Sequence, residues 1–220
     1  MKFKYALFDF DGTVINSIPA IVEGVKETFG HFNFPIPEDE EIKKYIGIPL
    51  KTYFPYLDPK CYENHHPDDV MNYYRNLYEN KYSETHITVY EGMDTLLKDL
   101  KASGVMTGIV SSKLTEPILM NMRQFKIEEY FDEIVGCDQV TKFKPLPETV
   151  FLCAQKLGIE DIRDAIVIGD SPKDIEMGQR AGCSTCAVPW GAGTVESLHE
   201  SKPDFYADTM DKLREVLLVA

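Results

Sequence analysis

The segment YALFDFDGTVINS, residues Tyr5–Ser17, begins as an apolar strand and ends in acidic groups. Its hydrophobic run is broken by Asp9 and Asp11, which are followed directly by Gly12 and Thr13. A carboxylate that is buried without a partner is very unfavourable. Two acids at the end of a buried strand therefore need a chemical explanation.

Four further segments have the same apolar character and are bounded by turn residues. They are residues 105–112, 132–138, 165–170 and 185–190, with 204–208 as a weaker candidate. Because these segments do not alternate between apolar and polar residues, they are typical of parallel strands covered by helices on both faces. Helical patterns at 115–125, 147–158 and 171–182 alternate with them. The sequence therefore predicts an α/β fold with a doubly wound, Rossmann-like parallel sheet and right-handed crossovers.

A long insert separates the first strand from the second. It contains amphipathic helical patterns at 17–30, 38–47 and 67–84, and no strand pattern. It also holds eight of the 12 tyrosines, which we interpret as the core of a small helical bundle. We therefore expect an α/β core made of residues 1–15 and 89–220, with residues 16–88 inserted as a helical cap.

Composition excludes several classes of function. The chain has 220 residues and a net charge of −13, with no Lys/Arg tract, so we expect no nucleic-acid partner. No apolar run approaches the roughly 18 residues of a membrane span. Five cysteines, an odd number in a chain of this size, indicate a reducing compartment rather than disulfides. We expect a cytoplasmic protein without a signal peptide, either monomeric or dimeric.

Polar side chains follow the predicted strands at the edge where open α/β sheets bind ligands. They are Asp9, Asp11, Ser111, Ser112, Lys142, Lys144, Asp170 and Asp174. Converging carboxylates need a hard cation, and Mg²⁺ prefers oxygen ligands and commonly bridges to a phosphate. Phosphoryl transfer relies on positioning and charge neutralisation, which a lysine and a serine hydroxyl can assist. The pattern predicts a Mg²⁺ site for phosphoryl transfer, with a carboxylate available to form an aspartyl phosphate.

Four motifs in this order, DFDGT, SSK, KPLPE and GDSPKD, resemble those of the haloacid dehalogenase superfamily. The insert resembles that family's C1 cap, and MGQRAG, VPWG and PDFYADTMDKL resemble its phosphoglycolate-phosphatase-like branch. The resemblance implies that Asp9 is the nucleophile and that Asp11 protonates the leaving group and later activates water. It also implies that Ser111 and Lys144 hold the phosphoryl group.

The same resemblance implies a ligand set for Mg²⁺. Asp9, Asp170 and the backbone carbonyl of Asp11 would bind the ion, with Asp174 as a further ligand or an indirect partner. Gly12, Thr13 and Ser112 would lie beside the phosphate, where a small residue allows close approach of the backbone.

A segment of the insert, YIGIPLKTYF, resembles the cap loop that reaches the active site in this branch. Gly47, Leu50 and Lys51 are therefore candidate specificity residues. The alternative is that the GIP stretch is only a turn between two cap helices.

The predicted substrate is a small phosphorylated metabolite; phosphoglycolate, a sugar phosphate, a nucleotide and pyrophosphate all remain open. One alternative is a phosphomutase of the β-phosphoglucomutase type, although VINSIPA after DGT lacks the polar pattern of those enzymes. A phosphonate hydrolase would need a cap lysine where this chain has Leu50, with Lys51 one place away. A binding protein on an inactive scaffold is a further alternative, which the intact set of acids disfavours.

Overall fold

A six-stranded parallel sheet forms the centre of the structure, which is a computed structural model describing residues 3–219. The strand order is β5-β4-β1-β6-β7-β8. The strands are β1 (Tyr5–Phe8), β4 (Met106–Val110), β5 (Glu133–Val135), β6 (Ala165–Gly169), β7 (Ser184–Ala187) and β8 (Phe205–Tyr206). The doubly wound α/β fold predicted from the sequence is confirmed, and the weak candidate at 204–208 forms the edge strand β8.

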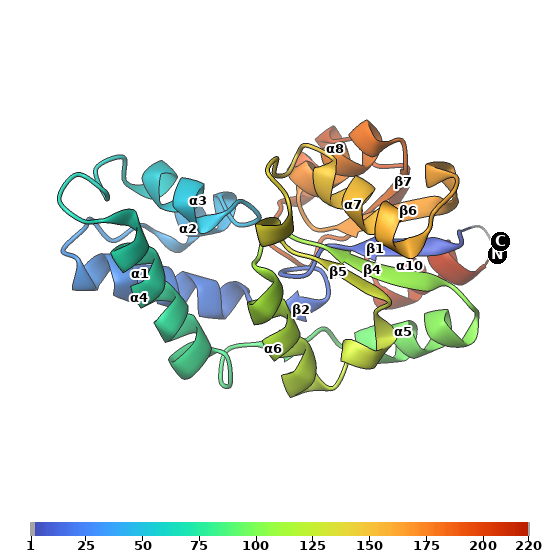
Figure 1. Ribbon diagram of the computed structural model, residues 1–220, viewed down its shortest axis with the longest axis horizontal. Coiled ribbons are helices and arrows are strands. Elements are labelled where there is room, and N and C mark those ends of the chain that lie inside the picture. Colours follow the sequence, from blue (N-terminus) through green and yellow to red (C-terminus); the bar gives the residue numbers. More distant parts are fainter. Residues whose placement is uncertain (1–2, 220) are drawn as a thin grey trace.

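Helices cover both faces of the sheet (Figure 1). Along β1, Leu7 packs into one hydrophobic cluster, whereas Ala6 and Phe8 pack into the other. The first cluster includes residues of α7 (Glu148–Leu157) and α8 (Pro172–Ala181). The second includes residues of α5 (Met93–Ala102), α6 (Thr115–Phe125) and α10 (Met210–Leu218). Because both faces are buried, the strands are apolar throughout rather than alternating.

Short elements complete this part of the chain. They are the helix α9 (Val195–Glu200) and the 3₁₀ turns η2 (Glu128–Tyr130), η3 (Cys137–Gln139) and η4 (Ile162–Asp164). Of these, η3 matters most for function, because it lies just after β5 on the way to Lys144.

The insert forms a helical lobe beside the sheet (Figure 1). It comprises α1 (Ile18–His31), α2 (Asp39–Lys44), α3 (Leu50–Leu57), α4 (Pro67–Leu77) and the π-helical turn η1 (Tyr78–Tyr82). Aromatic rings join three of its helices, since Phe54 makes edge contacts with Phe29 at 5.8 Å and with Tyr74 at 5.6 Å between ring centroids. The division into a core and a cap at residues 16–88 remains our interpretation of this arrangement.

Two details differ from the sequence-based expectation. The two chain segments that connect the sheet to the lobe pair as a short antiparallel ribbon of β2 (Ile15–Asn16) and β3 (Thr88–Val89). Each strand has only two residues, which is too short to produce a strand pattern in the sequence. In addition, α3 begins at Leu50, so Leu50 and Lys51 lie in the first turn of a helix and only residues 45–49 form the connecting turn.

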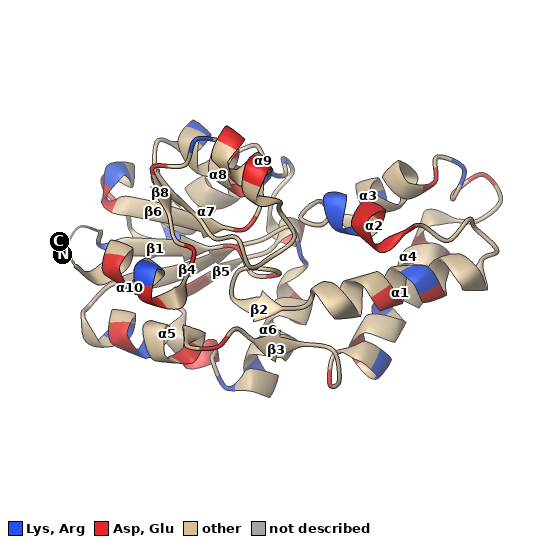
Figure 2. Ribbon diagram, turned by 180° about the vertical axis from the view of Figure 1, so that it is seen from behind, with Lys and Arg blue, Asp and Glu red and all other residues tan. Residues whose placement is uncertain are grey.

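Charged residues are spread over both parts of the molecule, with basic and acidic side chains intermingled (Figure 2). Across residues 3–219, no helix combines the length and the apolar character that crossing a bilayer requires.

Candidate active site

Three neighbouring strands, β4, β1 and β6, end at the same edge of the sheet. Each strand is followed directly by a polar residue, namely Ser111, Asp9 and Asp170. All three are buried, and the parallel pairing of the strands fixes their relative positions. The sheet therefore holds these side chains rigidly beside one another.

A buried cluster of carboxylates occupies this edge. One oxygen from each of Asp9, Asp170 and Asp174 lies within 4.8 Å of the others. Burial, more than any other cause, raises the pKa of Asp9 to about 7, and Lys144 opposes this rise. Burial also raises the pKa of Asp170 to about 8, with further contributions from the charges of Asp174 and Asp9. The cluster therefore holds negative charge that its surroundings do not fully offset.

Lys144 is the cation closest to these acids. Its Nζ lies 2.8 Å from Asp9 Oδ1 and 2.6 Å from Asp174 Oδ1. Burial lowers the pKa of Lys144, but the charges of Asp174 and Asp9 outweigh burial and raise it above its ordinary value. Lys144 therefore stays charged, whereas the neighbouring Lys142 is exposed. We call Asp9, Lys144, Asp170 and Asp174 the acidic floor.

Asp174 has hydrogen-bonding partners at both of its oxygens. Its Oδ1 accepts from Lys144, and its Oδ2 accepts from the backbone N–H and the hydroxyl of Ser171. With Ser171 it forms a capping box at the start of α8, which explains its position one turn along from Asp170. These contacts fix the orientation of the Asp174 carboxylate and, through it, of Lys144.

Asp170 is held by the segments that follow β1 and β7. Its Oδ1 accepts from the Thr13 hydroxyl at 2.9 Å, and its Oδ2 accepts from the Ala192 N–H at 2.7 Å. Gly12 has a positive φ of 84°, and a Cβ there would lie 2.4 Å from Asp170 Oδ2. Gly12 and Thr13 thus contact a floor residue, and their predicted contact with substrate stays a prediction.

The Asp11 carboxylate has its hydrogen-bond partners outside the acidic floor. Its Oδ1 accepts from Ser17 Oγ at 2.7 Å and from Lys113 Nζ at 2.9 Å. This carboxylate is partly exposed and lines a pocket, as expected of a group that exchanges protons with a substrate.

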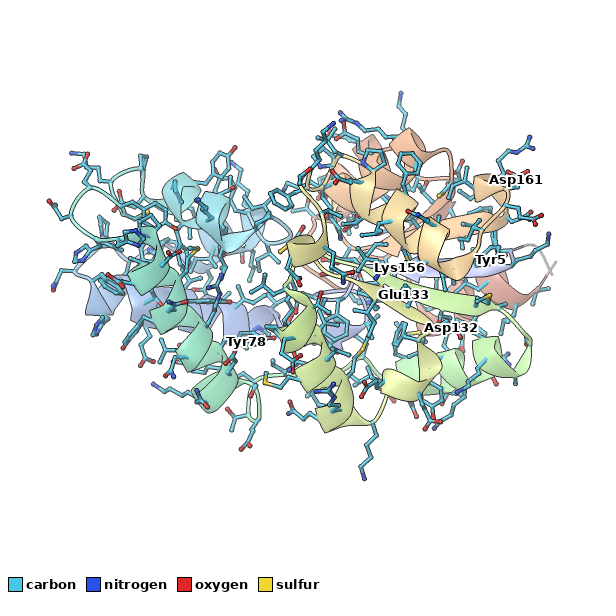
Figure 3. All side chains as sticks on the ribbon, viewed as in Figure 1. Tyr5, Tyr78, Asp132, Glu133, Lys156 and Asp161 are labelled. Atoms are coloured by element: carbon cyan, nitrogen blue, oxygen red, sulfur yellow. The ribbon has the colours of Figure 1, made fainter. Side chains whose placement is uncertain are left out.

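Lys113 is a site residue that our sequence analysis did not single out. Its Nζ donates to Asp11, to the Tyr78 hydroxyl and to Asn121 Oδ1, so all three of its protons have partners. Figure 3 shows Tyr78 at the end of α4, between the helical lobe and α6. The one available signal was position, since Lys113 comes three residues after the end of β4 within the SSK motif.

Ser111 and Ser112 have different surroundings. Ser111 is buried beside Asp9 at the sheet edge, and its backbone N–H donates to the Val135 carbonyl. The Ser112 hydroxyl donates to the Gly47 carbonyl at 2.7 Å, which links the core to the lobe. The structure therefore gives Ser112 a contact with the lobe, and its predicted contact with substrate stays a prediction.

A cavity of about 330 Å³ opens between the lobe and the sheet edge. The core side contributes Asp9, Asp11, Ser111, Ser112 and Lys113. The lobe contributes residues that we call the cap wall: Gly47, Leu50, Lys51, Tyr74, Arg75, Tyr78 and Glu79. The three specificity candidates Gly47, Leu50 and Lys51 therefore line the same cavity as Asp9 and Asp11.

The donor set of the acidic floor fits a hard divalent cation. Asp9 and Asp170 offer closely spaced carboxylate oxygens, and a divalent ion would offset the charge that raises their pKa values. Asp174 is close enough to complete the set and, like Asp170, accepts hydrogen bonds at both of its oxygens.

Comparison with known proteins identifies relatives along the whole chain. The family model for haloacid dehalogenase-like hydrolases matches residues 6–188. The pyrophosphatase PpaX of Bacillus pumilus is 34% identical over 211 residues, which cover 96% of this chain and 94% of that protein. A crystal structure of a predicted phosphatase from Clostridium acetobutylicum has a TM-score of 0.85 and 27% identity, covering 99% of each chain. A predicted phosphoglycolate phosphatase from Haemophilus somnus, with 24% identity, shares the fold at a TM-score of 0.84, over 99% of this chain and 97% of its own.

Proposed function

This chain belongs to the haloacid dehalogenase-like hydrolases, and from that premise we propose that it is a Mg²⁺-dependent phosphatase of small phosphorylated metabolites. It is a hydrolase of phosphoric esters or anhydrides, as its relatives are named. The observation that carries the proposal is the acidic floor: Asp9 lies against a charged lysine, beside Asp170, and faces the cavity.

Asp9 is the nucleophile in this proposal. One of its oxygens attacks phosphorus, and the bond between phosphorus and the leaving oxygen breaks while Asp11 supplies a proton to that oxygen. A water then attacks the aspartyl phosphate and returns its proton to Asp11, which releases inorganic phosphate and restores Asp9. Asp11 suits both steps because its carboxylate lines the cavity beside Asp9.

The remaining residues position and neutralise charge. Lys144 holds Asp9 through its 2.8 Å contact, and the hydroxyl of the buried Ser111 would donate to a phosphoryl oxygen. Asp9, Asp170 and the Asp11 carbonyl would hold Mg²⁺, with Asp174 orienting Lys144. When bound, the ion would neutralise phosphoryl oxygens and help to fix the phosphate against Asp9.

The size of the cavity supports a small substrate. The cavity of about 330 Å³ is near the lower end of the roughly 300–1,000 Å³ typical of ligand pockets. The net charge of −13 provides no general attraction for anions, so recognition must be local.

All five cysteines are free thiols, which supports a cytoplasmic location; a monomeric or dimeric state stays a prediction.

A pyrophosphatase is the second candidate, because the relative named pyrophosphatase PpaX aligns with 96% of this chain. Pyrophosphate hydrolysis would use the same residues, with phosphate as the leaving group. The two candidates therefore differ in the contacts of the cap wall rather than in the acidic floor.

A screen of phosphorylated metabolites that includes pyrophosphate tests the proposal. We expect phosphate release that needs Mg²⁺, stops with EDTA, is lost in Asp9→Asn and is retained in the surface control Asp161→Asn. Unchanged turnover in Asp9→Asn would refute the assignment. A sugar phosphate that isomerises in the presence of its bisphosphate without releasing phosphate would instead identify a mutase.

A further inference from the structure

The cavity walls carry three cationic side chains outside the acidic floor. Lys113 comes from the core, whereas Lys51 on α3 and Arg75 on α4 come from the cap wall. All three line the same cavity as Asp9 and Ser111. Our sequence analysis predicted a role for Lys51 but none for Arg75.

These cations differ in how their donors are used. The ammonium group of Lys113 is fully engaged by Asp11, Tyr78 and Asn121. Arg75 Nη1 donates to Asn72 Oδ1 at 3.0 Å, but its buried Nε has no hydrogen-bond partner among residues 3–219. A buried donor without a partner is unfavourable, so Arg75 retains binding capacity that a ligand could use.

Arg75 also reaches from the lobe toward the core. Burial and the nearby Asp138 raise the pKa of the Cys137 thiol to about 11, and the charge of Arg75 opposes this rise. Cys137 belongs to η3 and lines the cavity with Asp138. The guanidinium group therefore lies where the cap wall approaches the rim of the core.

No carboxylate neutralises Arg75 within the part of the chain that the structure describes. Glu79 and Asp138 line the same cavity, yet neither forms an ion pair with Arg75. Asp138 Oδ1 instead accepts from the backbone and hydroxyl of Thr115. Lys51, exposed in the first turn of α3, likewise has no ion-pair partner among residues 3–219.

We propose that Arg75, assisted by Lys51, binds a second anionic group of the substrate while the transferred phosphoryl group lies against Asp9 and Ser111. A guanidinium group presents paired N–H donors that match a carboxylate or a phosphate. The substrates are then small phosphate esters or anhydrides with a second phosphate or carboxylate group, rather than esters of neutral alcohols. This inference rests on the proposed function, because it takes the acidic floor as the site of the transferred group.

A binding measurement tests the subsite without turnover. Methylenediphosphonate and methylphosphonate are titrated calorimetrically into the protein at one fixed concentration of free Mg²⁺. The wild type should bind the diphosphonate about 10- to 100-fold more tightly, as expected for one charge-assisted contact. Arg75→Met should remove most of this preference, Arg75→Lys should retain part of it, and Lys51→Met should reduce it less.

Lys60→Met is the matched control, because it removes one positive charge from an exposed position of the lobe outside the cavity. It should leave the preference unchanged. Equal binding of the two phosphonates by the wild type, or an unaltered preference in Arg75→Met, would overturn the inference.

A kinetic comparison separates this inference from the proposed function. Arg75→Met should lower kcat/KM for pyrophosphate or phosphoglycolate about 10- to 100-fold, mainly through KM, and leave p-nitrophenyl phosphate within about twofold. An equal loss on all substrates would reveal a structural role and overturn the inference. Failure of the proposed function would give a different result, namely phosphate release that Asp9→Asn does not reduce.

Discussion

The acidic floor and the cap wall meet in one cavity, but they differ in how their polar groups are satisfied. On the floor, Lys144 bridges two acids, and Asp174 and Asp170 each accept hydrogen bonds at both oxygens. On the cap wall, Arg75 Nε has no hydrogen-bond partner among the residues that the structure describes, and Lys51 is exposed. Carboxylates held by a lysine and by hydrogen bonds suit chemistry that needs fixed geometry. A wall with an unpaired donor suits recognition of a ligand that supplies the missing contact.

The largest expected effect comes from breaking the floor at Lys144. Lys144→Met leaves Asp9 and Asp174 buried without their cation, so we expect a loss of about 3–5 kcal/mol in the free energy of unfolding and loss of turnover. Denaturant titration measures the free energy of unfolding, and phosphate release measures turnover. Lys142→Met, at the exposed neighbouring lysine, should change neither.

This destabilisation should depend on pH. Asp9 already has a pKa of about 7, above the value of about 3.9 for an unfolded aspartate, and losing Lys144 would raise it further. Stability falls as pH rises from about 4 to the raised folded-state pKa, because the unfolded chain releases this proton in a range where the folded state still binds it. Without Mg²⁺, Lys144→Met should therefore be more destabilised at about pH 8 than at about pH 5, and an opposite trend would contradict our description of the floor.

A smaller effect is expected where the floor meets the backbone at Gly12. In Gly12→Ala, the positive φ and the close approach to Asp170 should together cost about 2–3 kcal/mol of stability and displace the Asp170 carboxylate. Gly104→Ala is the matched control, since Gly104 also has a positive φ but has no atom within 4 Å of an added Cβ. The control should lose only about 1 kcal/mol. Equal losses in denaturant titration would show that contact with Asp170 is unimportant.

The smallest effect is expected at the junction between the wall and the core. Tyr78→Phe removes the hydroxyl that accepts from Lys113 and donates to Asn121, which should cost about 1 kcal/mol in the free energy of unfolding. Tyr56→Phe, at an exposed position of the same lobe, should have no effect. A loss in Tyr78→Phe as large as that in Lys144→Met would mean that the wall is as rigidly bonded as the floor.

The parts of the site that were visible in the sequence are those close to strand ends. Asp9, Ser111 and Asp170 directly follow apolar strands, and Asp174 lies one helical turn beyond Asp170. The apolar pattern of a strand and the position of its end can be recognised locally in the sequence. Once the sheet is predicted to be parallel, these residues are expected to lie at the same edge. The preference for Lys144 over Lys142 came from the resemblance, and their burial in the structure differs accordingly.

The parts that were missed depend on contacts between distant segments. Lys113 reaches Tyr78 across 35 positions of the sequence and Asp11 across 102, and neither pairing leaves a periodic pattern. The same holds for the two-residue strands β2 and β3, which pair only because the insert folds back on itself. At α3, the resemblance to a cap loop did not show that a helix begins at Leu50, whereas the alternative of a turn between two cap helices agrees with the structure.

The sequence by itself determined the α/β sheet and the acids at its edge, because apolar periodicity and the order of strand ends are written along the chain. Only the tertiary structure decided which oxygens accept from which donors, where the lobe faces the sheet, and that Arg75, which lines the cavity, has a buried Nε without a hydrogen-bond partner in the part of the chain that the structure describes. These outcomes arise from side chains of separate elements packing together, and the free energies of such contacts depend on distances that no local pattern encodes.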